Sequence, residues 1–177
     1  MSEIETVRLS DNAYFKVWYE RDAEPPLDED DSIKLVVLHR RYADPSEGRL
    51  GRTPNEVEAW EHLNQEEWAT FKLWMYDHGS VALGIGEGNP FSCPWDSGRV
   101  GIVAVEKSEF PDPEAAAIRA VDEYSSYING SVYYVELFKN DEMVYALGPL
   151  YGHEQLEQVK DELERNYSEY TRGTSLD

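Results

Sequence analysis

The sequence predicts an α+β domain in which a mainly antiparallel sheet, built from hairpins, carries three to four packed helices. Three observations predict this class. Short runs rich in Val, Tyr, Phe and Trp are bounded by turn residues, as strands are. Several of these runs are joined by short turns, which favours hairpins and antiparallel pairing. Other segments carry helix-capping residues or apolar residues at helical spacing. The length of 177 residues fits one domain over 1–177.

The expected strands are separated by polar or glycine-containing segments. A tight turn over 77–80 joins two of them into a hairpin, and a turn over 139–142 forms a second hairpin. Residues 148–152, which contain Gly and Pro, are expected to form a loop. The expected strands cover 14–20, 33–39, 71–76, 81–85, 100–105, 132–138 and 143–147.

Helix starts are predicted where a capping side chain precedes a proline. Thr53 has this pattern, with Pro54 in the first turn and an acidic residue behind it, and the run Pro-Asp-Pro-Glu at 111–114 is expected to open the later helix. Apolar residues at helical spacing predict the last helix. The expected helices cover 53–63, a short segment over 64–70, 111–128 and 153–170, and the tail 171–177 is expected to fray.

The charge balance is the most unusual property of the composition. There are 36 acidic and 16 basic residues, which gives a formal net charge of -20 and a pI of about 4.4. This charge repels phosphate backbones and anionic lipid surfaces, so direct nucleic-acid and membrane binding are not expected. A basic protein is the expected partner. An acidic structural or regulatory protein of a halophilic host is an alternative that the charge leaves open.

Cysteine content and hydropathy indicate the cellular setting. The single cysteine, Cys93, cannot form an internal disulfide or a cysteine-rich zinc site, which favours a reducing, cytoplasmic location in a host cell. We expect neither a signal peptide nor a membrane span, because no long apolar run is present. The four histidines lack metal-ligand spacing, so no metal or cofactor is expected.

The acidic residues gather in one loop and on the predicted helices. The loop 22–32 contains two prolines and an acidic run, and is expected to be exposed. Carboxylates held on a rigid helix can imitate a row of DNA phosphates. The expected partner-binding residues are Asp28, Glu29, Asp30 and Asp31 of the loop and Glu157, Asp161, Glu162 and Glu164 of the last helix.

A second group of residues could carry catalysis. A cysteine nucleophile needs a nearby imidazole and a carboxylate that orients it, and Cys93, His78 and Asp96 could form such a set in a small hydrolase. The competing interpretation is a structural turn over 93–98, in which Asp96 bonds to the backbone and Trp95 packs. Because no oxyanion-stabilising element is visible in the sequence, a non-enzymatic protein is the main expectation.

The segment Phe71–Gly152 resembles a family of largely uncharacterised proteins carried by phages and mobile elements. The resemblance rests on Tyr-Asp-His-Gly at 76–79, Pro-Phe-Ser-Cys-Pro-Trp-Asp-Ser-Gly at 90–98, Val-Gly at 100–101 and the segment 124–133. It implies a phage or mobile-element setting and supplies no catalytic residues. With the charge, it leads us to expect an anti-restriction or anti-CRISPR inhibitor that occludes the basic nucleic-acid site of a host defence enzyme by DNA mimicry.

Overall fold

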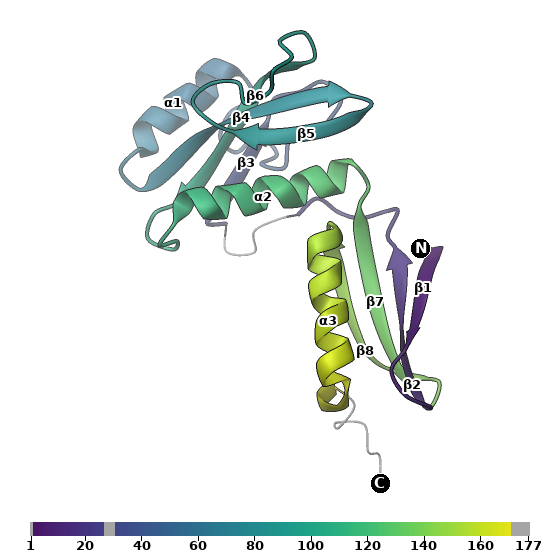
Figure 1. The fold of residues 1–177 in the computed structure, drawn as a ribbon. Helices are drawn as coiled ribbons and strands as arrows, with labels where there is room; N and C mark the ends of the chain where they lie inside the picture. Colours follow the sequence, from purple (N-terminus) through teal and green to yellow (C-terminus); the bar gives the residue numbers. More distant parts are fainter. Residues whose placement is uncertain (1, 27–30, 171–177) are drawn as a thin grey trace. The chain divides into compact units, whose positions relative to one another are not determined.

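The computed structural model describes residues 2–26 and 31–170 of the chain. In this part of the chain, two antiparallel sheets of four strands each are accompanied by three helices, which confirms the α+β class (Figure 1). Asp28, Glu29 and Asp30 of the expected acidic loop, and the tail 171–177, lie outside the described residues.

The residue contacts divide the chain into two compact units. From its length we expect one domain. Unit 1 combines Met1–Glu24 with Gly130–Asp177, and unit 2 is Pro25–Asn129. Unit 2 is therefore an insertion between two strands that are neighbours in the sheet of unit 1.

Unit 1 is a four-stranded sheet with one helix. The sheet order is β1-β2-β7-β8, and every neighbouring pair is antiparallel. The elements are β1 (Ser2–Arg8), β2 (Ala13–Tyr19), β7 (Val132–Lys139), β8 (Glu142–Tyr151) and α3 (His153–Tyr170).

The core of unit 1 lies between this sheet and α3. Alternate residues of a strand point to opposite faces of the sheet, and those of β2 and β7 that face the core are fully buried. Leu156 and Leu163 of α3 pack in the same cluster, with exposed fractions of 5% and 1%. The opposite face of the sheet therefore has no part in this core.

Unit 2 is a second four-stranded antiparallel sheet, with the order β3-β6-β4-β5, and two helices. Its elements are β3 (Ile33–Val37), α1 (Pro54–Asn64), β4 (Trp68–His78), β5 (Ser80–Ile85), β6 (Ser97–Glu106) and α2 (Pro113–Ile128). The larger core lies between α2 and one face of this sheet, and the smaller one involves Val57 of α1 and Ile102 on β6. Gly101 allows β3 to approach closely, because a Cβ atom there would lie 1.8 Å from the carbonyl oxygen of Val36.

The predicted helix starts are confirmed by their caps. The Thr53 hydroxyl accepts a hydrogen bond from the backbone N–H of Glu56 at 3.3 Å, and the Asp112 carboxylate accepts one from Ala115 at 3.1 Å. Each cap satisfies a backbone donor that the helix itself leaves free. None of the helices in the described part of the chain has the length and apolar character that a bilayer crossing requires.

The short helix predicted over 64–70 is wrong, because β4 already begins at Trp68. Trp68 pairs with Glu106 of β6, and its ring packs edge-on against Trp60 with centroids 5.6 Å apart. The loop predicted over 148–152 is also wrong, since β8 continues to Tyr151. Pro149 fits there because β8 is an edge strand and its register shifts at this point.

Candidate functional site

Helix α3 presents the densest acidic surface of unit 1. Its inward side carries the two buried leucines, and most of its exposed residues are charged. Six carboxylates are exposed on this helix, against two cationic side chains, Lys160 and Arg165. The exposed acids are Glu154, Glu157, Asp161, Glu162, Glu164 and Glu169. The four residues expected on this helix are therefore all on its solvent side.

Four of these carboxylates form a stripe along one side of α3. The residues Glu154, Glu157, Asp161 and Glu164 are spaced by three, four and three positions, which keeps them on one face of a helix. At about 1.5 Å of rise per residue, the stripe is roughly 15 Å long. One DNA strand presents a phosphate about every 3.4 Å of helix axis, so this length corresponds to roughly four phosphates.

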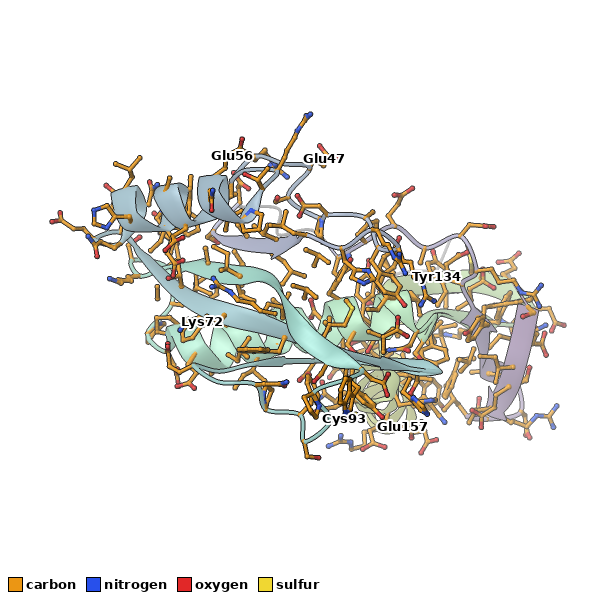
Figure 2. The ribbon with its side chains drawn as sticks, turned by 90° about the horizontal axis from the view of Figure 1, so that it is seen from above. Glu47, Glu56, Lys72, Cys93, Tyr134 and Glu157 are labelled. Carbon is orange, nitrogen blue, oxygen red and sulfur yellow. The ribbon has the colours of Figure 1, made fainter. Side chains whose placement is uncertain are left out.

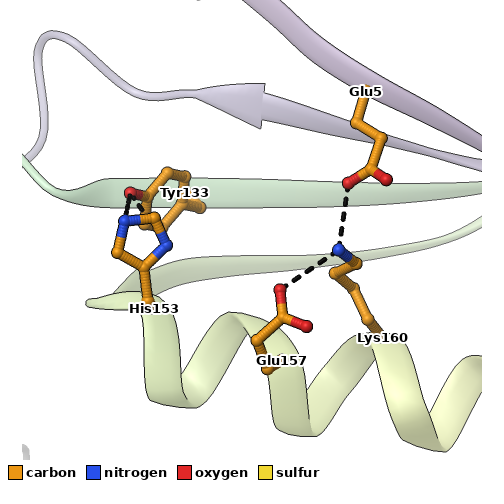
Figure 3. Close-up of polar contacts among 5 residues, drawn as sticks. All are labelled: Glu5, Tyr133, His153, Glu157 and Lys160. Atoms are coloured by element: carbon orange, nitrogen blue, oxygen red, sulfur yellow. Dashed lines mark hydrogen bonds and ion pairs between the residues drawn. The ribbon is translucent and has the colours of Figure 1, made fainter.

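Part of the stripe is neutralised by neighbouring cations. The Lys160 ammonium lies 3.0 Å from a carboxylate oxygen of Glu5 on β1 and 3.1 Å from one of Glu157 (Figure 3). The hydrogen bond with Glu5 raises the pKa of Lys160 above its ordinary value. Arg165 lies 3.9 Å from Asp161, and both of these side chains are about 70% exposed (72% and 69%). We therefore expect Lys160 to neutralise the stripe more strongly than Arg165 does.

The remaining acids have different surroundings. Glu162 accepts a hydrogen bond from the hydroxyl of Tyr170, which raises the pKa of Tyr170 to about 12. At the start of the helix, the Tyr133 hydroxyl lies 3.0 Å from Nε2 of His153 and connects α3 to β7 (Figure 3). Glu164 is exposed. The stripe is thus carried by a helix that is fixed to its sheet at the N-terminal end.

Of the four loop residues predicted to bind a partner, Asp31 is the one that the structure describes, and it is not a free carboxylate. Its oxygens lie 2.6 Å from the Lys34 ammonium and 3.3 Å from the Arg49 guanidinium. The hydrogen bond with Lys34 lowers the pKa of Asp31. Asp31 belongs to unit 2, whereas the helix acids belong to unit 1.

The structure brings Cys93, His78 and Asp96 together around one carboxylate oxygen. Oδ2 of Asp96 lies 3.1 Å from Nδ1 of His78 and accepts a hydrogen bond from the Cys93 thiol at 3.7 Å. Figure 2 labels Cys93. The thiol thus bonds to the carboxylate, whereas activation of a cysteine nucleophile needs the imidazole in that position. This arrangement favours a structural role for the three side chains.

The loop that carries Cys93 is held by hydrogen bonds of its own. The Ser97 hydroxyl donates to the carbonyl of Cys93 and accepts from the Asn89 amide at 2.8 Å. The backbone carbonyl of Asp96 accepts from the N–H of Asp77 at 2.9 Å. These contacts agree with a structural turn, but the expectation that Trp95 packs within it is wrong, because Trp95 is 93% exposed.

Within 2–26 and 31–170, no three His, Cys, Asp or Glu side chains are grouped so that they could hold a metal ion. In the glycine-containing segment that follows β5, Glu87 lies 2.6 Å from the Lys72 ammonium. That carboxylate would repel a phosphate in the same segment.

Sequence reasoning missed one surface of unit 1. The sheet face opposite α3 carries aromatic side chains on two neighbouring strands, among them Trp18 on β2 and Tyr134 on β7. The signal was present, because aromatic residues in these strands occupy both alternating positions and one core can take only one of the two sets.

Comparison of the chain with protein-family models, with curated proteins and with solved structures finds no match.

Proposed function

We propose that this protein is a non-enzymatic inhibitor that occupies the basic nucleic-acid site of another protein, with the acidic side of α3 in the place of a DNA strand. The observation that carries the proposal is the stripe of four exposed carboxylates, Glu154, Glu157, Asp161 and Glu164, on one rigid helix. The net charge of -20 supports it, because a strong field of one sign steers a basic partner toward the protein.

The nature of the target is supported by the resemblance of the segment Phe71–Gly152 to proteins of phages and mobile elements. A protein in that setting gains from blocking restriction or CRISPR nucleases, whose DNA channels are positively charged. The proposed partner is therefore a host defence enzyme with a basic DNA-binding channel.

The test is inhibition of DNA cleavage by a panel of restriction and CRISPR nucleases. One variant neutralises the stripe, and a matched variant removes the same charge from exposed acids of unit 2. The stripe variant carries Glu154→Gln, Glu157→Gln, Asp161→Asn and Glu164→Gln. The matched variant carries Glu58→Gln, Glu66→Gln, Glu67→Gln and Glu109→Gln.

The two variants should differ in a defined way. An exposed ion pair contributes about 0.2–1 kcal/mol, so loss of four pairs should weaken inhibition by about 1–4 kcal/mol, or roughly 4-fold to several hundred-fold. The matched variant should lose much less, and wild-type inhibition should weaken as salt is raised. Equal inhibition by both variants at every salt concentration would rule out phosphate mimicry by α3.

A further inference from the structure

The sheet of unit 1 has a second surface, on the side opposite α3, that the proposed function does not use. The residues of β2 and β7 that alternate with the buried core residues point to this side and, apart from the buried Val132, are half-buried. We name this surface the aromatic face. It consists of Tyr14, Lys16, Trp18, Tyr134, Glu136 and Phe138.

The aromatic face is built from three cross-strand pairs. Tyr14 lies opposite Phe138, Lys16 opposite Glu136, and Trp18 opposite Tyr134. The rings of Tyr14 and Phe138 are stacked, with centroids 5.1 Å apart and planes 10° from parallel. Directly opposed residues support each other in this way, and here two pairs of rings flank the charged pair Lys16–Glu136.

The polar ends of the Trp18 and Tyr14 rings are already satisfied within unit 1. The indole N–H of Trp18 donates to Glu136 at 2.8 Å, and the Tyr14 hydroxyl donates to Asp141 at 3.3 Å. Tyr134, labelled in Figure 2, is seated against Gly148 of β8, where a Cβ atom would come within 2.3 Å of the ring. What the face offers to a ligand is therefore its ring surfaces and its carboxylates.

The face already binds one cation, which belongs to the chain itself. The Lys16 ammonium lies 5.5 Å from the ring centre of Trp18 and 6.0 Å from that of Phe138. It also lies 2.8 Å from a carboxylate oxygen of Glu3 on β1. An ammonium held between aromatic rings and a carboxylate is a cation–π site.

We propose that the aromatic face binds an arginine-rich segment of a partner protein. Planar guanidinium groups can stack on exposed rings and pair with carboxylates at the same time, which a lysine ammonium does less well. Glu136 and Asp141 supply carboxylates beside the rings, and the net charge of -20 favours a cationic segment. Nucleic acid bases also stack on such rings, but these carboxylates repel phosphates.

This inference shares one requirement with the proposed function, which is a cationic partner. The surface itself is separate, because it lies on the side of the unit 1 sheet opposite α3. The probes are oligoarginine and oligolysine peptides of equal length, titrated into the full-length protein at physiological ionic strength. A surface that recognises charge alone binds both peptides equally. The aromatic face should prefer oligoarginine.

The preference should depend on the rings and not on α3. Each lost cation–π contact at an exposed site should weaken oligoarginine binding roughly 2- to 5-fold. Trp18→Leu and Tyr134→Leu should therefore reduce the preference for arginine. The stripe variant of α3 should weaken binding of both peptides equally and leave the preference unchanged, so failure of one proposal is distinguishable from failure of the other.

A variant that should bind more tightly is also needed, because a gain in affinity cannot result from misfolding of the protein. Lys16→Met removes the internal cation that competes for Glu3 and the rings, so it should tighten oligoarginine binding. Arg119→Met removes the same charge from an exposed position on α2 and is the matched control. The inference is overturned if both peptides bind equally to every variant, if Lys16→Met matches Arg119→Met, or if an oligothymidylate binds the face and loses affinity with Trp18→Leu.

Discussion

Replacement of Lys160 by methionine should change the stability of unit 1 and the binding strength of α3 in opposite directions. The Lys160 side chain is 17% exposed and lies 3.0 Å from Glu5 and 3.1 Å from Glu157. Methionine retains most of the apolar contact of the lysine stem, so the variant removes mainly the two ion pairs. Each pair with a partly exposed partner contributes about 0.2–1 kcal/mol, so the expected loss of unfolding free energy is about 0.5–2 kcal/mol.

Arg165→Met is the matched control for this prediction. It also removes one cation from α3, but the Arg165–Asp161 distance is 3.9 Å and both side chains are about 70% exposed (72% and 69%). Its effect on stability should be close to zero. Both variants make α3 more negative, so both should tighten binding to a basic target if the stripe is the binding surface.

The assay is urea unfolding followed by circular dichroism, repeated as a function of pH. The bond with Glu5 raises the pKa of Lys160 above its ordinary 10.5, so its contribution is complete below about pH 10.5. That contribution is lost as the pH rises through the raised pKa. Equal stability of Lys160→Met and Arg165→Met at neutral pH would refute the role assigned to Lys160.

Four further substitutions test the core and the Cys93 loop. Leu163→Ala should lower the free energy of unfolding by about 2–5 kcal/mol, because the side chain is 1% exposed in the core of unit 1; a smaller loss in urea unfolding would contradict this packing. Tyr124→Phe removes a 2.7 Å hydrogen bond to the carbonyl of Ala43 and should cost about 0.5–1.5 kcal/mol in the same assay. Cys93→Ala and His78→Ala should leave nuclease inhibition unchanged, and a loss of activity in either folded variant would favour a hydrolase.

The parts of the fold that sequence analysis predicts well are those fixed by local chemistry. Thr53 and Asp112 cap helices where their side chains and the following prolines indicate, and α3 runs from His153 to Tyr170 as its apolar spacing predicts. These features depend on neighbours within a few residues.

The features that sequence analysis misses depend on long-range pairing. Strand β1 carries few apolar residues because it is an edge strand, and its pairing with β2 is invisible in its composition. Trp68 is part of β4 because it pairs with Glu106 of β6, which lies far along the chain.

The candidate site follows the same division. Helical spacing predicts that Glu157, Asp161 and Glu164 are exposed, and the structure confirms it. The ion pair between Lys160 and Glu5 is not predictable from the sequence, because β1 and α3 come together only in the folded unit. The exposure of Trp95 is likewise not what its hydrophobicity predicts.

The most direct test of DNA mimicry is whether this protein and a DNA duplex exclude each other from the same target. The measurement is the apparent inhibition constant against a responsive nuclease as the concentration of duplex DNA is raised. If α3 occupies the DNA channel, the constant should rise linearly with the DNA concentration, and the stripe variant should raise both the intercept and the slope of that line. An inhibition constant that does not depend on DNA concentration would contradict the account, because it would place the protein outside the nucleic-acid site.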